Sequence, residues 1–116
     1  MHSKRGRLSG LRKSPRGTED YDSHLERQYM VELDHDPAVK EWTKQHNVVI
    51  PYKLLGFSHC YHPDFLVTLT NGSKEIHETK GLPLLFWVST KAKRVTAEEY
   101  CRQLGWKYKL VTRLPH

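Results

Sequence analysis

The feature that most constrains the fold is a hairpin signal, an Asn-Gly pair at 71–72 between two short strand-like runs at 65–69 and 74–80. A tight turn fixes which residues of the two strands face each other. Any charged residues at the outer ends of the runs are therefore brought together. The sequence has three such residues there: Asp64, Glu78 and Lys80.

The length of the turn decides which side chains meet. A two-residue turn would pair Asp64 with Thr79, which lies on the other face of the strand from Glu78. A three-residue loop over 70–72 would instead place Asp64 directly opposite Glu78. That loop requires a left-handed residue, and Gly72 adopts this conformation freely. We therefore expect the three-residue loop and a facing pair of carboxylates.

Two facing carboxylates repel each other unless a cation lies between them. Mg²⁺ is the natural cation, since it binds to one or two carboxylates together with water and substrate phosphate. Mn²⁺ is the expected substitute. The sequence thus predicts a divalent metal site at Asp64 and Glu78, with Lys80 on the same strand face as Glu78.

A helix over residues 22–33 supplies a third carboxylate, Glu26. Apolar residues recur at helical spacing along this segment, and Ser23 with Glu26 matches a capping box. If the apolar stripe packs on the face that carries Glu78 and Lys80, Glu26 approaches the metal. The alternative is that Glu26 serves only the capping box.

The remaining segments predict a single-domain α/β fold with a mixed sheet flanked by helices. After the helix breaks at Asp36-Pro37, the expected elements are a short helix at 37–42, strands at 48–52 and 84–88, a helix at 90–104 and a last strand at 106–111.

Positive charge is concentrated at the two ends of the chain. There are 19 Lys and Arg against 13 Asp and Glu, a formal net charge of +6, which favours a nucleic acid partner. Residues 1–20 hold little apolar surface and are expected to form a flexible basic arm ahead of a folded domain at 21–116. The candidate DNA-binding residues are those of the arm and of the last helix: Lys4, Arg5, Arg7, Arg12, Lys13, Arg16, Lys91, Lys93 and Arg94.

Taken in order, these motifs resemble the PD-(D/E)xK nuclease superfamily, and in particular the N-terminal catalytic domain of the transposition endonuclease subunit TnsA. The resemblance covers about residues 21–113. It rests on an ordered set of motifs: Ser23-x-x-Glu26, Asp36-Pro37-x-Val39, the strand at 48–52, Pro63-Asp64-Phe65, Glu78-Thr79-Lys80, and Gly105-Trp106 through Thr112.

The resemblance implies a restriction-endonuclease-like fold and metal-dependent hydrolysis of DNA. It implies that Glu26, Asp64 and Glu78 bind the metal and that Lys80 orients or activates water. The transposition subunit has a further C-terminal domain and this sequence ends at His116, so a stand-alone nuclease of a virus or mobile element is expected. The alternatives are a catalytically silent DNA-binding or assembly module and a dimeric junction resolvase.

No segment is long and apolar enough for a membrane span, which needs about 20 residues. The longest apolar run, 82–88, has seven residues and contains a proline. Without a secretory signal, the expected location is the cytoplasm, with the protein associated with the nucleoid, or the host-cell cytoplasm for a viral protein. The expected partners are DNA and either a second copy of the chain or a larger DNA-processing complex.

Overall fold

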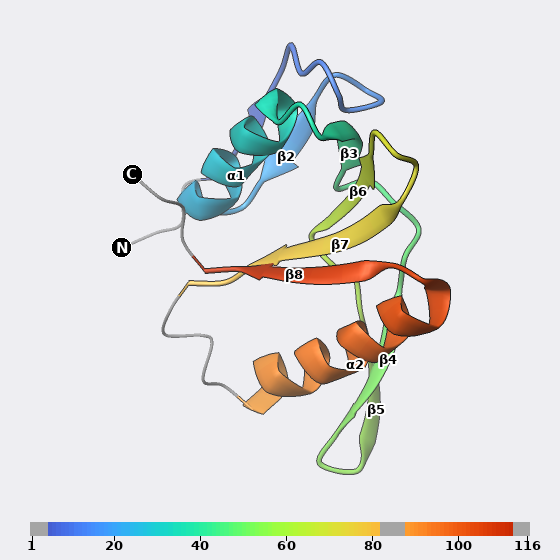
Figure 1. The fold of residues 1–116 in the computed structure, drawn as a ribbon. Coiled ribbons are helices and arrows are strands. Elements are labelled where there is room, and N and C mark those ends of the chain that lie inside the picture. Colours follow the sequence, from blue (N-terminus) through green and yellow to red (C-terminus); the bar gives the residue numbers. More distant parts are fainter. Residues whose placement is uncertain (1–4, 82–87, 113–116) are drawn as a thin grey trace.

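The centre of the fold is a four-stranded mixed sheet in the order β3-β6-β7-β8, seen in the computed structural model (Figure 1), which describes residues 5–81 and 88–112. The first three strands are antiparallel, and β8 runs parallel to β7. The strand bounds are β3 (Val39–Thr43), β6 (Phe65–Leu69), β7 (Lys74–Thr79) and β8 (Lys107–Val111).

The two helices cover opposite faces of this sheet, so each face has its own core. Helix α1 (His24–His35) packs Met30 and Leu33 against Phe65 of β6. Helix α2 (Val88–Leu104) packs Ala97 and Cys101 around Ile76 of β7. A mixed sheet flanked by helices is therefore confirmed. In the part of the chain that the structure describes, neither helix is long and apolar enough to span a membrane.

The β6–β7 hairpin has the register of the three-residue loop. Phe65 pairs with His77 and Leu66 with Ile76. Gly72 takes a φ of 89°, in the left-handed region that favours glycine. The strand pair is closed by a 2.8 Å hydrogen bond from the Leu69 amide to a carbonyl across the loop. Continued by one residue, this register sets Asp64 against Glu78, as the loop length predicts.

The prediction of a short helix at 37–42 is wrong, because this segment contributes to strand β3. Val39 and Trp42 are both buried on the α1 face, three residues apart. A bulge between Val39 and Glu41 inserts one extra residue against β6. The bulge turns the two-residue repeat of a strand into a three-residue spacing, which imitates the repeat of a helix.

Residues 5–20, which the sequence predicts to belong to a flexible arm, pack on the domain in the structure. Strands β1 (Gly6–Leu8) and β2 (Glu19–Tyr21) form a two-stranded sheet. Leu8 and Leu11 contact the α1 core. The arm has little apolar surface, as expected, but buried carboxylates hold it in place.

Two acids make those attachments. Asp34 of α1 accepts hydrogen bonds from the backbone amides of Arg12 and Lys13, at 3.0 and 2.9 Å. Glu19, which is 1% exposed, accepts from the Ser14 hydroxyl at 2.5 Å and from the Thr43 hydroxyl at 2.8 Å. Polar bonds thus replace the missing hydrophobic surface.

The remaining expectations concern the middle and the C-terminal half. Helix α1, helix α2 and strand β8 match the predicted segments to within two residues. The strand expected at 48–52 appears as β4 (Ile50–Leu54), which pairs with an additional strand, β5 (Phe57–Tyr61), that the sequence did not indicate. The strand expected at 84–88 lies outside the described residues except for Val88, which begins α2.

Candidate active site

A cavity of about 330 Å³ lies at the end of the sheet, where β6 begins and β7 ends. It brings together the start of α1, the residue before β6 and the residues that follow β7. Three of the four predicted catalytic residues line it. The lining residues are Asp22, Ser23, Leu25, Glu26, Asp64, Thr79, Lys80 and Gly81.

Asp64 is held across the hairpin by its neighbour strand. Its Oδ2 atom accepts hydrogen bonds from the Thr79 amide at 2.9 Å and from the Thr79 hydroxyl at 3.1 Å. Both bonds fix one carboxylate oxygen and orient the group toward the cavity. Lys80 is positioned next to it, because its backbone amide donates to the Val111 carbonyl of β8 at 2.9 Å.

Glu78 is the most unusual acid of the site. It is 6% exposed, and its Oε1 atom is buried without a hydrogen-bond partner among the described residues. Burial, followed by the negative charge of Asp64, raises the pKa of Glu78 to about 7, although the positive charge of Lys80 opposes the rise. The positive charge of Lys93 and the Tyr61 hydroxyl also oppose the rise, so Glu78 is a buried carboxyl with one unpartnered oxygen and a pKa that stays raised despite these neighbours.

Glu26 lies in the first turn of α1 and takes part in the cap that the sequence predicts. The Ser23 hydroxyl accepts from the Glu26 amide at 3.1 Å, and the Glu26 carboxylate accepts from the Asp22 amide at 3.0 Å. Burial raises the pKa of Glu26, which Asp64 also raises, while contact with the Lys44 ammonium lowers it. The cap and the site therefore share one carboxylate.

The prediction that α1 packs on the sheet face of Glu78 is wrong, although Glu26 still lines the cavity with Asp64. Helix α1 covers the sheet face of His77, whose Nδ1 atom lies 2.5 Å from the Tyr29 hydroxyl. Glu78 lies on the opposite face of β7 because adjacent strand residues alternate. Glu26 reaches the cavity around the end of the strand and not across its face. The three acids consequently approach from two sides of the sheet edge.

The acids shift one another's pKa, but the described residues do not form a complete metal-binding cluster. The charge of Asp64 raises the pKa of both Glu26 and Glu78, in each case after burial. Within residues 5–81 and 88–112, no three His, Cys, Asp or Glu side chains are grouped closely enough to hold a metal ion. Their chemistry suits a hard cation, since all three offer carboxylate oxygens.

Sequence reasoning missed Lys44, which lies next to the site. Its side chain is 17% exposed, and its ammonium contacts Glu26 and lies 4.0 Å from Asp22. Lys44 follows β3 in a loop without a motif, so only the folded chain brings it to α1. It is the cation nearest to Glu26 in the described part of the chain.

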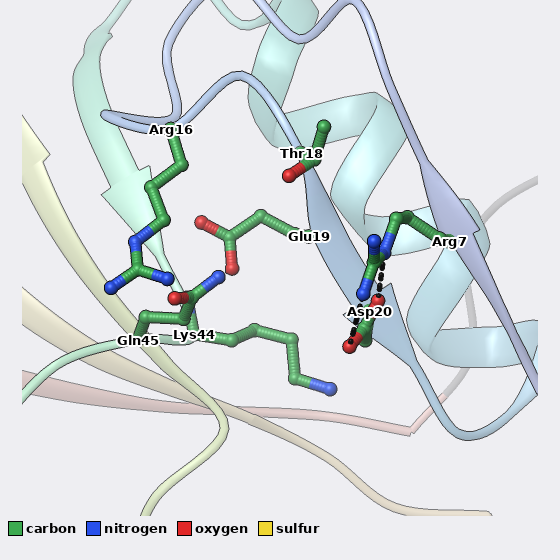
Figure 2. Close-up of a pocket in the computed structure, with 7 residues that line it drawn as sticks. All are labelled: Arg7, Arg16, Thr18, Glu19, Asp20, Lys44 and Gln45. Carbon is green, nitrogen blue, oxygen red and sulfur yellow. Dashed lines mark hydrogen bonds and ion pairs between the residues drawn. The ribbon is translucent and has the colours of Figure 1, made fainter.

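Lys44 lines a separate cavity of about 330 Å³, shown in Figure 2. Arg16 from the arm enters the same cavity, whereas Arg7 is turned toward Asp20, with an Nε–Oδ1 distance of 2.7 Å. Lys44 contacts Glu26, which lines the first cavity, so Lys44 links the arm to the acids. The residues that line the second cavity are Arg7, Arg16, Thr18, Glu19, Asp20, Lys44 and Gln45.

The candidate DNA-binding residues are divided between the arm and α2. In the arm, Arg12 and Arg16 are exposed, and the Lys13 ammonium contacts the Asp36 carbonyl. On α2, Lys91 is exposed. Lys4 lies outside the described residues. The others lie near acidic or aromatic side chains: Arg5 near Asp22, Arg7 with Asp20, Lys93 over two tyrosine rings, and Arg94 near Glu98.

The comparison with known families agrees with this geometry. The family described as TnsA-like endonuclease N terminal matches residues 36–113, more than half of the chain. The matched region contains Asp64, Glu78 and Lys80, whereas Glu26 precedes it. No match to an individual curated protein was found. The chain belongs to the TnsA-like endonuclease N-terminal family.

Proposed function

We propose that this nuclease-family protein is a Mg²⁺-dependent endodeoxyribonuclease, with Glu26, Asp64 and Glu78 as metal ligands and Lys80 as a catalytic residue. The observation that carries the proposal is the buried Oε1 atom of Glu78, which has no hydrogen-bond partner among the described residues. A buried acceptor without a partner is costly, and structural carboxylates avoid it. Its position across the hairpin from Asp64 supports a functional purpose.

The donor set fits a hard divalent cation. Asp64 and Glu78 repel each other across the strand pair, and the rise in the pKa of Glu78 expresses that repulsion together with burial. Mg²⁺ prefers carboxylate oxygens and retains water ligands, so it needs few protein groups. A bound Mg²⁺, or Mn²⁺ in its place, would polarise the scissile phosphate and lower the pKa of the attacking water.

The protein groups around the cavity would prepare the substrate for this chemistry. Thr79 holds Asp64 in one orientation through two hydrogen bonds. The Lys80 side chain lines the cavity beside it, where an ammonium would orient water and stabilise the extra negative charge of the transition state. The exposed bases of the arm and of α2 would bind the phosphates on either side.

The assembly and the origin of the protein stay predictions. For the assembly, the sequence predicts a nuclease that acts on its own, as a homodimer or within a larger DNA-processing complex. It also predicts a viral or mobile-element source and a cytoplasmic, nucleoid-associated location. The fold supports DNA as the substrate through the family to which the chain belongs.

Cleavage of supercoiled plasmid tests the proposal. The wild-type protein is expected to nick or linearise plasmid with Mg²⁺ and to be inactive with EDTA. Lys80→Ala should retain DNA affinity while losing cleavage. Binding of plasmid without cleavage under any divalent metal would reject the enzyme and favour a silent DNA-binding module. Cleavage restricted to branched DNA would favour a junction resolvase.

A further inference from the structure

The hairpin formed by β4 and β5 projects from the body of the molecule past α2 (Figure 1). At its root, Ile50 is fully buried and Tyr61 packs against the α2 core. At its tip, Leu55 and Phe57 are 85% and 71% exposed. Two large apolar side chains are thus held in solvent by a hairpin with a firmly packed root.

One face of this hairpin is apolar or aromatic along its whole length. The cross-strand pairs Ile50–Tyr61, Tyr52–His59 and Leu54–Phe57 share that face, because alternate residues of a strand point the same way. The rings of Tyr52 and His59 stack, with centroids 5.2 Å apart. The face begins in the core and continues beyond the helix that covers its root.

The surroundings of this face are cationic. Residues 44–63 contain no Asp or Glu, although the whole chain has 13. Lys53 is exposed on the opposite face of β4. Lys93 of α2 lies over the root, with its ammonium 5.7 Å from the Tyr52 ring centroid and 5.4 Å from that of Tyr61. A polyanion is the partner that this charge distribution favours.

The hairpin also has a defined relation to the candidate active site. Tyr61 at its root is three residues before Asp64 in the chain. The tip is five residues further along the strand, or about 16 Å at about 3.3 Å per residue. That length equals about five base pairs of duplex DNA at 3.4 Å per step along each strand.

We propose that the β4–β5 hairpin is a DNA-contacting element that places Leu55 and Phe57 in a groove of the duplex outside the segment held at the candidate active site. The proposal rests on the proposed nuclease function. Apolar side chains at the tip of a rigid element act in this way in minor-groove binders, where they wedge against or between bases. Lys53 and Lys93 contact the flanking phosphates.

A protein partner fits this surface less well. A stable protein interface buries about 800 Å² on each side and is depleted in charge at its centre. The tip offers two side chains and a narrow turn, with Lys53 adjacent. Duplex DNA needs no broad apolar patch, because its phosphates supply most of the affinity.

Fluorescence anisotropy with a 30-base-pair duplex in EDTA tests the proposal. The double variant Leu55→Ser/Phe57→Ser is expected to bind about tenfold more weakly than wild type with an unchanged salt slope, since no charge is lost. Lys53→Gln should reduce the slope of log K against log salt by about one. Val31→Ser, an exposed apolar residue on α1, is the matched control and should bind like wild type. Thermal melts should show all variants folded, because the changed side chains lie in solvent.

Equal duplex affinity of the double variant and wild type would overturn the proposal. The proposal would also be overturned if the double variant bound DNA like wild type but eluted from gel filtration, without DNA, at a different mass. That result would favour a contact between copies of the chain. The proposed function fails separately, if wild type does not cleave plasmid with Mg²⁺. Wild-type cleavage together with an unaffected double variant would reject the hairpin's role alone.

Discussion

The molecule has two sets of buried carboxylates, one at the arm and one at the candidate active site, and they differ in how completely they are hydrogen-bonded. Asp34 and Glu19, which attach the arm, each accept three hydrogen bonds, including one from the Trp42 indole to Asp34 at 3.0 Å. Glu78 at the candidate active site has a buried oxygen without a partner in the described chain. Both sets are similarly buried, so burial alone does not distinguish structural from functional acids.

The pKa directions separate Asp34 from the acids of the candidate active site. Burial alone would raise the pKa of Asp34, but the amides of Arg12 and Lys13 and the Trp42 indole hold it below its ordinary value. Burial and neighbouring charge raise the pKa of both Glu78 and Glu26. The hydrogen bonds of Asp34 thus favour its charged form, whereas the surroundings of Glu78 favour its neutral form unless a cation binds.

The largest effect is expected at Asp64. Asp64→Asn should reduce cleavage by about a thousandfold, because it removes the proposed metal ligand and its negative charge. Stability should be retained or raised, since repulsion with Glu78 is relieved. Plasmid nicking rates and thermal melts measure both quantities. A variant that keeps full activity would exclude Asp64 from the site.

The next effect is expected in the arm. Asp34→Ala should lower the free energy of unfolding by about 3 kcal/mol, because three donors lose their buried acceptor. Limited proteolysis should then cut within residues 5–20 first. Glu32→Ala, an exposed change on the same helix, is the control and should stay within about 0.5 kcal/mol of wild type. An equally stable Asp34→Ala would mean that the arm contributes nothing to folding.

Glu78 should give the protein an unusual pH dependence. Its pKa is about 7 in the folded state and near 4.5 when unfolded, so the folded state binds the extra proton. Without metal, the stability contributed by protonated Glu78 is present below about pH 4.5 and is lost as pH rises to about 7. Glu78→Gln should remove this loss and be roughly 2 kcal/mol more stable than wild type at pH 8. Denaturant titrations at pH 4.5, 6 and 8 measure the difference, and identical pH profiles would contradict the assignment.

The smallest effect is expected at Lys44. Lys44→Met should lower stability by about 1 kcal/mol at pH 7.5, because the buried Glu26 carboxylate loses its ammonium partner. The loss should shrink at pH 4, where Glu26 becomes protonated. Lys40→Met, an exposed lysine on β3, provides the comparison. A loss that is the same at both pH values would show that Lys44 acts through packing.

Much of the site could be predicted because its information is local. The Asn-Gly turn with Gly72 fixes the hairpin register, and the register fixes Asp64 against Glu78. Similarly, Ser23 and Glu26 lie within one helical turn, so their bond follows from spacing. The family resemblance added the roles of these residues.

The parts that could not be predicted depend on contacts between distant segments. The bulge in β3 gave Val39 and Trp42 a helical spacing. The low apolar content of the arm predicts a flexible segment. In the structure Asp34, 22 residues away from Arg12, holds the arm through hydrogen bonds. Lys44 meets Glu26 only because β3 and α1 pack together. Periodicity and composition do not report such long-range polar contacts.

The central claim is that the incompletely satisfied carboxylates bind a metal and the fully bonded ones do not. Calorimetric titration of Mn²⁺ into wild type, Glu78→Gln and Glu19→Gln at pH 7.5 tests it most directly, with melts to confirm that each variant is folded. Wild type and Glu19→Gln should bind Mn²⁺ alike, and Glu78→Gln should bind at least about tenfold more weakly. Equal binding by Glu78→Gln and wild type, or loss of binding in folded Glu19→Gln, would contradict the claim.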